Sequence, residues 1–447
     1  MNLLEKIKDA GVIGAGGAGF PTHIKLKCKV EVLIINGAEC EPLLKTDQYL
    51  MRERTEELVE AIEMAGKEVG AEKIYLAVKK KYGKEIEALK STIARRDSPI
   101  QLFFLDNFFP AGDEQVLVYE VTGRTVPPGG IPLQSKALVS NVGTMINIYE
   151  ALQGKPVTHK YIAVLGEVKD PKLLKVPVGT SAARCIAAAG GPLTEDYCVI
   201  MGGPMMGQII DDVDIHHKVI KKTDSALIVL DKDHYIVKRN RTPMAHIINQ
   251  SKSACIQCRF CTDLCPRYLI GHPLRPHKIM GAIATKTIED EAFREALICC
   301  DCGICELYAC PMGLSPRLVN GYLKGELRKR GIAFHSPGTA VIPSESRDYR
   351  KIPVNRLIAR IGLEKYTYQM VDSVEEIQAD QVSIPLRQHI GVAAEAMVAV
   401  GDWVERGQCI GKIEDGKLGA NIHASIGGRV TAVGQAIDIK QEEGVME

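Results

Sequence analysis

The sequence of 447 residues is poor in aromatic side chains and has no large excess of charge of either sign. Aromatic residues make up 5% of the chain and include a single tryptophan, Trp403, which we expect to anchor a core. Lys and Arg total 56 against 55 Asp and Glu, so no net field draws the chain to nucleic acid or to an anionic membrane. Proteins and small redox molecules are left as the expected partners.

The chain also lacks a long apolar run. No stretch approaches the roughly 18 residues that a membrane-spanning helix needs, and the first residues form a charged helical pattern instead of a secretory signal. We therefore expect a cytoplasmic protein whose membrane contact, if any, is indirect through partner subunits. With 46% apolar residues, the chain is long enough to form several domains.

Cysteine, in contrast, is abundant, and nine of the 14 cysteines lie between Cys255 and Cys310. The first run there, C-x2-C-x2-C-x3-C-P, is the one that bacterial ferredoxins use for four-iron clusters, and the second run differs by one extra residue in its last gap. In ferredoxins the fourth cysteine of each run completes the cluster of the other run. The predicted ligands are Cys255, Cys258, Cys261 and Cys310 for one cluster, and Cys265, Cys299, Cys302 and Cys305 for the other.

Two alternatives stay open for this segment. Cys300 breaks the register of the second run and is either a bystander thiol, which we favour, or a substitute ligand. A pair of structural zinc sites would also use C-x2-C pairs, but two triplets that are each closed by Cys-Pro favour iron-sulfur clusters. Two clusters in one module usually form a relay, so we expect the protein to pass electrons through itself.

A glycine-rich segment, GAGGAGFP, occupies residues 14–21. Glycines let backbone amides approach an anion such as a flavin phosphate, although a flexible turn has the same composition. A dinucleotide fingerprint follows a strand and opens a helix, whereas here a helical pattern precedes the glycines. The usual Rossmann interpretation therefore fails for this segment.

A strand-helix-strand unit is predicted directly after the glycines. Residues 32–36 and 74–78 have the pattern of buried strands, and residues 55–69 have an apolar stripe at helical spacing. Such a unit is parallel and right-handed, and its ligands bind at the carboxyl ends of the strands. We therefore expect Asn36, Glu39 and Glu41 at the ligand edge of the sheet.

These motifs resemble a known flavoprotein family. GAGGAGFPTHIKL with INGAECEP resembles the flavin-binding segment of the complex I flavoprotein and of RnfC-like proteins of the Rnf complex, and FPAGDEQ and VSNVGT resemble later loops of that site. Ala38 departs from the complex I pattern, which has an acidic residue there. The resemblance implies FMN as cofactor and NADH as donor, bound by Gly14, Gly16, Gly17, Gly19, Phe20, Lys25, Asn36, Glu39, Glu41, Asp113, Glu114, Asn141 and Thr144. Among these, Phe20 and Glu41 match nicotinamide positions.

Two further segments resemble known domains. Residues 161–207, with VPVGTS and GGPMMG, resemble the SLBB β-grasp domain, which here is either a spacer, as we favour, or a small-ligand site. VAVGDWVERGQCIGKI and ANIHASIGGRVTAV resemble a barrel-sandwich hybrid, where Lys417 suits a solvated turn better than a swinging carrier arm. This domain order resembles that of PduS-type cobalamin reductases.

The predicted fold is a multidomain chain of the α/β and α+β classes. Its expected parts are a Rossmann-like FMN and NADH domain (1–155), an SLBB β-grasp domain (156–235), a helical ferredoxin-like module for two [4Fe-4S] clusters (245–330), a linker (331–372) and a barrel-sandwich hybrid (373–440).

The predicted function is electron transfer from NADH through FMN and two [4Fe-4S] clusters to a corrinoid or a redox protein, with no catalytic acid or base. The first alternative is an iron-sulfur adaptor that does not oxidise NADH, because VPPGGIP at residues 126–132 offers no ring to hold a nicotinamide. The second is a metal-stabilised scaffold without redox function. The expected location is the cytoplasm, within a bacterial microcompartment or beside a membrane complex, and homo-oligomerisation stays open.

Overall fold

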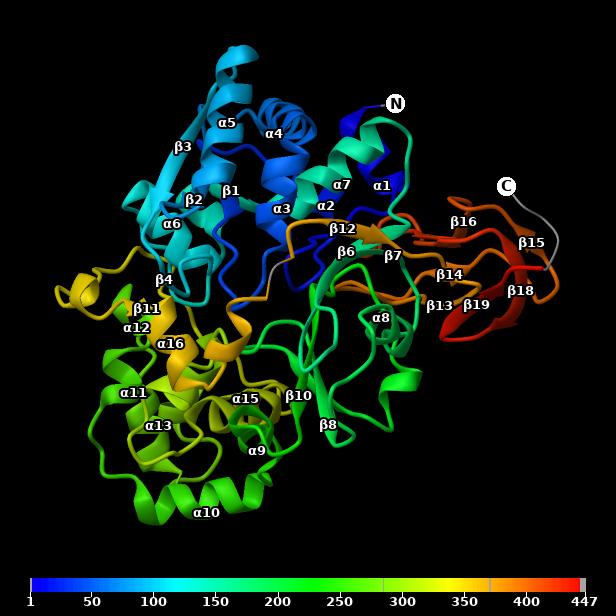
Figure 1. Cartoon of the computed structure of the whole chain (residues 1–447). Helices are drawn as coiled ribbons and strands as arrows, with labels where there is room; N and C mark the ends of the chain where they lie inside the picture. Colours follow the sequence, from blue (N-terminus) through cyan, green and yellow to red (C-terminus); the bar gives the residue numbers. More distant parts are fainter. Residues whose placement is uncertain (1, 284, 370, 443–447) are drawn as a thin grey trace.

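The computed structural model describes residues 2–283, 285–369 and 371–442. In Figure 1 the blue and cyan N-terminal part lies at the top, the green and yellow middle of the chain lies below it, and the red C-terminal part lies to the right. No helix within the described ranges is both long enough and apolar enough to span a bilayer.

The N-terminal part is built on a parallel four-stranded sheet with the order β3-β2-β1-β5. The predicted strand-helix-strand unit is confirmed, because β1 and β2 pair in parallel and α4 covers the predicted residues 55–69 between them. The apolar stripe of α4 is buried against the sheet. The elements are α1 (Leu3–Asp9), α2 (Thr22–Lys25), β1 (Val32–Gly37), α3 (Thr46–Glu53), α4 (Thr55–Val69), β2 (Lys73–Lys79), α5 (Gly83–Arg95), β3 (Ile100–Leu105), β4 (Phe108–Phe109), α6 (Glu114–Thr122), β5 (Ala137–Asn141) and α7 (Val142–Leu152).

The next part is a six-stranded mixed sheet with the order β12-β7-β6-β10-β8-β9. Its edge strand β12 comes from residues 374–376, far along the chain, and pairs in parallel with β7. The return of the chain to this edge joins the residues that directly follow the linker to the β-grasp sheet. The elements are β6 (His159–Gly166), β7 (Lys172–Pro177), α8 (Ala182–Ala188), β8 (Tyr197–Met201), β9 (Gln208–Asp211), β10 (Ala226–Asp231) and β12 (Val374–Glu376).

The cysteine-rich part is a set of short helices. Cys265 is the N-cap residue of α12, and a π-helical turn over Ile304–Tyr308 contains Cys305. The helices are α9 (Tyr235–Arg241), α10 (Met244–Ala254), α11 (Phe260–Asp263), α12 (Pro266–Leu269), α13 (Pro276–Ala282), α14 (Glu291–Arg294) and α15 (Pro316–Lys329).

The linker joins these three parts. Strand β11 (Ile352–Pro353) pairs antiparallel with β4 of the flavin part, and α16 (Val354–Arg360) follows it. One apolar core contains Phe109 from the flavin part, Leu165 from the β-grasp sheet, Ile304 from the cysteine-rich part and Leu357 from α16. The three parts are therefore packed on one another through a shared core.

The C-terminal part consists of two small sheets with a common core. Trp403, which we expected to be an anchor, is 43% exposed, so that expectation is wrong; Val382, Ile384 and Ile410 fill the core instead. The strands are β13 (Gln381–Pro385), β19 (Ala436–Lys440), β18 (Gly428–Val433) and β15 (Trp403–Val404) in one sheet, and β14 (Glu395–Ala396), β16 (Cys409–Lys412) and β17 (Ile422–His423) in the other.

Candidate functional site

A cavity of about 2610 Å³ opens where the carboxyl edge of the flavin sheet meets the β-grasp and C-terminal parts. Pockets for drug-sized ligands usually measure roughly 300–1,000 Å³, so this cavity has room for more than one large ligand. Every residue that the sequence assigned to FMN or NADH lines it: Gly14, Gly16, Gly17, Gly19, Phe20, Lys25, Asn36, Glu39, Glu41, Asp113, Glu114, Asn141 and Thr144.

The glycine-rich segment forms a closed loop at one wall of the cavity. The Gly14 N–H donates to the Phe20 carbonyl at 2.9 Å, which joins the two ends of the loop. A Cβ on Gly16 would lie 2.9 Å from Asn141 Cγ, so the loop approaches Asn141 too closely for a side chain. A Cβ on Gly17 would meet no heavy atom of the described residues within 4 Å. The backbone around Gly17 is therefore open to a ligand.

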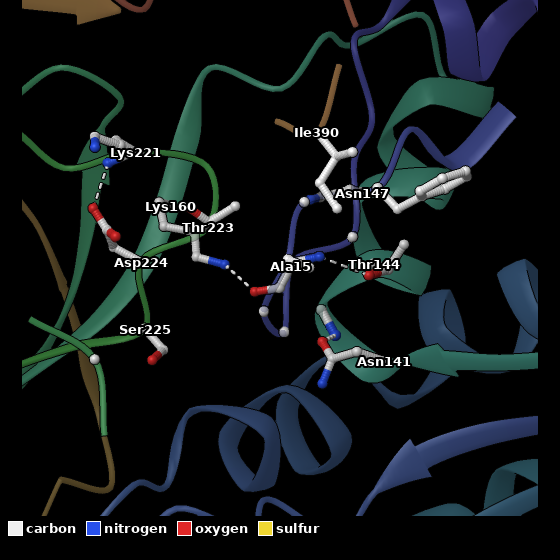
Figure 2. Close-up of a pocket in the computed structure, with 18 of the residues that line it drawn as sticks. Ala15, Asn141, Thr144, Asn147, Lys160, Lys221, Thr223, Asp224, Ser225 and Ile390 are labelled. Atoms are coloured by element: carbon white, nitrogen blue, oxygen red, sulfur yellow. Dashed lines mark hydrogen bonds between the residues drawn. The ribbon is translucent and has the colours of Figure 1, made fainter. Parts of the chain in front are cut away.

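Two polar side chains hold this loop from opposite sides (Figure 2). The Ala15 N–H donates to Thr144 Oγ1 at 2.9 Å, and Lys160 Nζ donates to the Ala15 carbonyl at 3.0 Å. Burial lowers the pKa of Lys160 to about 8, although the Asp47 and Asp224 carboxylates act the other way. Sequence reasoning missed Lys160, because it is the second residue of β6 in the β-grasp sheet and belongs to no recognised motif.

Two half-buried carboxyl groups, those of Glu39 and Asp47, also line the cavity. The Asp47 N–H donates to Glu39 Oε1 at 2.9 Å, so Glu39 caps α3, and Asn141 Nδ2 donates to Asp47 Oδ2 at 2.7 Å. Burial, followed by the Asp47 charge, raises the pKa of Glu39 to about 7, and burial raises that of Asp47 to about 6. Asp47 was also missed, since its helix bears no recognised motif.

Two motif loops are joined at the edge of the sheet. Asn36 Nδ2 donates to the Gly112 carbonyl at 2.9 Å, and the Gly112 N–H donates to Cys40 Sγ at 2.6 Å. These contacts bring INGAECEP and FPAGDEQ together, as the resemblance implies. Cys40 is half-buried and lines the cavity.

The acidic residues of these loops are engaged with other parts of the chain. The Met205 N–H of the β-grasp part donates to Glu41 Oε2 at 2.9 Å, and burial raises the Glu41 pKa to about 7. Lys25 Nζ is paired with Glu114 at 2.7 Å. Asp113 Oδ1 accepts two N–H groups at the start of α6. These carboxylates bind other parts of the protein in addition to lining the cavity.

The cysteines of the first run gather with Cys310. Burial raises the pKa of Cys261 to about 12, and the neighbouring thiols of Cys310, Cys255 and Cys258 act in the same direction. The Leu314 N–H donates to Cys310 Sγ at 3.3 Å. Cys258 is exposed to solvent, so this group lies at the surface.

The cysteines of the second run gather with Cys265 in the interior. Cys265, Cys299, Cys302 and Cys305 line one small cavity, together with Cys300. Cys300 and Cys302 also line the large cavity. A hydrogen bond with Cys302, and then the Arg267 charge, lower the pKa of Cys300 to about 7 against the effect of burial.

Eight thiols in two groups of four are the donor set that two four-iron clusters require. The extra residue before Cys310 does not prevent it from reaching the first group. Over residues 2–283, 285–369 and 371–442, no three His, Cys, Asp or Glu side chains are arranged around a single metal ion.

The chain matches four protein-family descriptions in the order of its parts. Residues 7–150 match the Nuo51 FMN-binding domain, residues 161–208 the SLBB domain, residues 254–315 the 4Fe-4S dicluster domain, and residues 365–446 the RnfC barrel sandwich hybrid domain. Among solved structures, the NAD+-reducing [NiFe]-hydrogenase in the H2-reduced state has a TM-score of 0.49 and 20% identity, covering 74% of this chain and 62% of that chain.

Curated relatives extend over nearly the whole sequence. Cobalamin reductase PduS of Salmonella typhimurium is 41% identical over 98% of this chain and 96% of its own length, and that of Citrobacter freundii is 40% identical over 96% and 94%. One component of the Na+-translocating ferredoxin:NAD+ oxidoreductase complex of Acetobacterium woodii is 34% identical over 60% of this chain and 58% of its own length. The chain therefore belongs to the PduS family of cobalamin reductases, and it is an oxidoreductase with an FMN-binding domain, an SLBB domain and a domain for two four-iron clusters.

Proposed function

We propose that the chain transfers electrons from NADH, by way of FMN in the large cavity and two four-iron clusters on the cysteine groups, to a corrinoid or a redox protein. The observation that carries this proposal is that Cys302 lines both the large cavity and the small cavity of the second cysteine group. When bound, FMN converts a hydride pair into single electrons, and the clusters hold electrons singly.

The glycine loop is the proposed binding site of the FMN phosphate. The space beside Gly17 is open, which suits an anion that needs close approach of the backbone. Thr144 and Lys160 act on the loop through Ala15, and so they fix its shape. Lys25 would exchange its partner Glu114 for the phosphate, or share its charge between the two.

The two cysteine groups differ in solvent exposure, and this difference suggests the order in which electrons pass through the two clusters. Cys265, Cys302 and Cys305 are at most 9% exposed, and Cys302 lines the large cavity. Cys258 is exposed, and its sequence neighbours Ile256 and Phe260 are 62% and 46% exposed. The second group is then the entry from the flavin. The first group is the exit, where an acceptor can approach.

The proposed identities of the electron donor and acceptor are based on the names of the relatives and on the open cavity. NADH would enter near Phe20 and Glu41, which line the same cavity as the glycine loop. A corrinoid is the acceptor that the names of the PduS relatives suggest, and a redox protein is the acceptor that the Rnf relatives suggest. We place the protein in the bacterial cytoplasm, inside a microcompartment or beside a membrane complex.

One observation favours the adaptor as second candidate. Glu41 Oε2 already accepts the Met205 N–H, and residues 131–133, which end the VPPGGIP segment and line the cavity, include no aromatic ring. An adaptor would keep the clusters and accept electrons from another protein.

Anaerobic stopped-flow mixing of the reconstituted protein with NADH separates these candidates. Rapid bleaching of the flavin is expected for the oxidoreductase. No bleaching, in protein that has full flavin, iron and sulfide contents, would leave the adaptor. Preparations of the unsubstituted chain with zinc and no acid-labile sulfide would contradict both and leave a scaffold.

A further inference from the structure

A buried ion pair links the flavin part to the second cysteine group. Arg267 lies in α12, two residues after Cys265, and its Nη2 donates to Asp113 Oδ2 at 2.8 Å. Both side chains are nearly inaccessible, with 10% and 13% exposure. Asp113 also caps α6 of the flavin part. The pair therefore connects the loop beside the proposed flavin to the helix that Cys265 begins.

The guanidinium of Arg267 also reaches the cysteines. Its charge interacts with the thiols of Cys300 and Cys265, and both of these cysteines line the small cavity of the second group. Arg267 Nε is buried and has no partner in the described part of the chain. A buried N–H without an acceptor costs free energy unless a bound group accepts it. A cluster held by Cys265 and Cys302 would supply sulfur atoms, which are the kind of acceptor that this N–H lacks.

We propose that Arg267, held by Asp113, is a positioning residue that raises the reduction potential of the cluster nearer the flavin. This inference rests on the proposed function, because it needs a four-iron cluster on Cys265, Cys299, Cys302 and Cys305. Arg267 takes no part in the chemistry itself. Its role is to supply a fixed positive charge and an N–H donor to that cluster.

The sign of the effect follows from charge. Reduction adds one negative charge to a cluster, and a nearby cation in a dry environment stabilises the reduced form. An arginine keeps its charge at every accessible pH, so the effect does not depend on titration. Asp113 partly offsets the cation, because it is a buried carboxylate within 2.8 Å of the guanidinium. Removing Arg267 and removing the Asp113 charge should therefore shift the potential in opposite directions.

The test uses the full chain with both clusters, in an EPR-monitored redox titration. The variants are Arg267→Gln, Arg267→Lys and Asp113→Asn, and iron and sulfide contents are measured for each. Arg347→Gln is the matched control, because Arg347 forms a comparably buried ion pair with Glu120 on the same helix α6.

We expect Arg267→Gln to make one of the two cluster potentials more negative, Arg267→Lys to shift it less, and Asp113→Asn to make the same potential more positive. The other cluster and the Arg347→Gln control should be unchanged. Unchanged potentials in loaded Arg267→Gln and Asp113→Asn, or shifts of the same sign in both, would overturn the inference. Should Arg267→Gln fail to bind clusters, the sign in Asp113→Asn decides alone.

The failure of this inference and that of the proposed function are distinguishable. Wild-type protein without iron and sulfide would contradict the proposed function before any variant is compared. Wild-type protein with two clusters, and variants without the predicted opposite shifts, would contradict only the role of Arg267.

Discussion

Replacing Lys222 with methionine should lower the free energy of unfolding of the C-terminal part, by an amount that depends on pH. Lys222 is 2% exposed, and its Nζ donates to the carbonyls of Gly11 in the flavin part, at 2.8 Å, and Asn421 in the C-terminal part, at 3.0 Å. Burial lowers the pKa of Lys222 to about 7, while the Cys409 thiol acts the other way. The amine is therefore largely neutral above that pH, and a neutral amine still has two N–H donors for these two carbonyls.

The size of the effect follows from two contributions. In Lys222→Met both buried carbonyls lose their donor, at about 1–3 kcal/mol each, so we expect a loss of about 2–6 kcal/mol near pH 9. The unfolded chain keeps a lysine pKa of about 10.4, so between pH 7 and 10 it binds more protons than the folded chain. Wild-type stability then rises with pH by up to about 1.4 kcal/mol per unit, and the methionine variant lacks this rise. The difference between the two proteins should shrink by about 2 kcal/mol from about pH 9 to about pH 7.5.

The single tryptophan provides the assay. Trp403 lies in the C-terminal part, so its fluorescence during denaturant unfolding reports on that part alone. Nearby histidines do not disturb the comparison, because burial lowers the pKa of His423 to about 3 and also lowers that of His389. Lys417→Met, at an exposed turn of the same part, is the control and should change stability by less than about 0.5 kcal/mol. A gap between wild type and Lys222→Met that is equal at both pH values would refute a buried neutral amine.

Three further changes test the site. Gly17→Ala should weaken FMN binding severalfold in an equilibrium titration and leave apoprotein stability unchanged, because its Cβ would project into open space. Gly83→Ala is the control: its Cβ is equally free of contacts but lies in α5, so neither FMN affinity nor stability should change. Normal FMN affinity in Gly17→Ala would contradict the proposed phosphate site. Cys300→Ser should retain full iron and sulfide, whereas Cys302→Ser should lose about half of both; loss in Cys300→Ser would identify it as a ligand. Trp403→Phe should cost less than about 1 kcal/mol in thermal unfolding, and a cost above about 3 kcal/mol would contradict its exposed position.

Local patterns were sufficient wherever one segment determines its own structure. The helix over residues 55–69 was predicted to the residue, because its apolar spacing fits a single buried face. The grouping of Cys310 with the first run also agrees with the spacing, since ferredoxin-type loops exchange their fourth cysteines. Trp403 was misjudged because a hairpin with alternating residues does not reveal which of its faces is covered.

Contacts between distant segments could not be read from the sequence. Lys160 supports the glycine loop from a strand of the β-grasp sheet, and Asp47 meets Asn141 from a separate helix. A role for Arg267 was not predicted, because no sequence motif marks an arginine after Cys-Pro, and only the structure shows its contact with Asp113. In each case the partner lies at least 94 residues away, so no spacing rule could connect them.

These distant contacts have a consequence for how the flavin site is assembled. Lys160 joins the β-grasp part to the glycine loop, Lys222 joins the flavin part to the C-terminal part, and Arg267 joins the flavin part to the cysteines. The Ile390 N–H of the C-terminal part also donates to the Gly19 carbonyl at 3.2 Å. The cavity wall is therefore complete only when all parts are docked. Residues 1–155 alone would keep the glycine loop and its Thr144 contact but lose Lys160 at Ala15 and Ile390 at Gly19. The relative arrangement of the domains, as much as the flavin motif, therefore determines whether the proposed cofactor is held beside the second cysteine group.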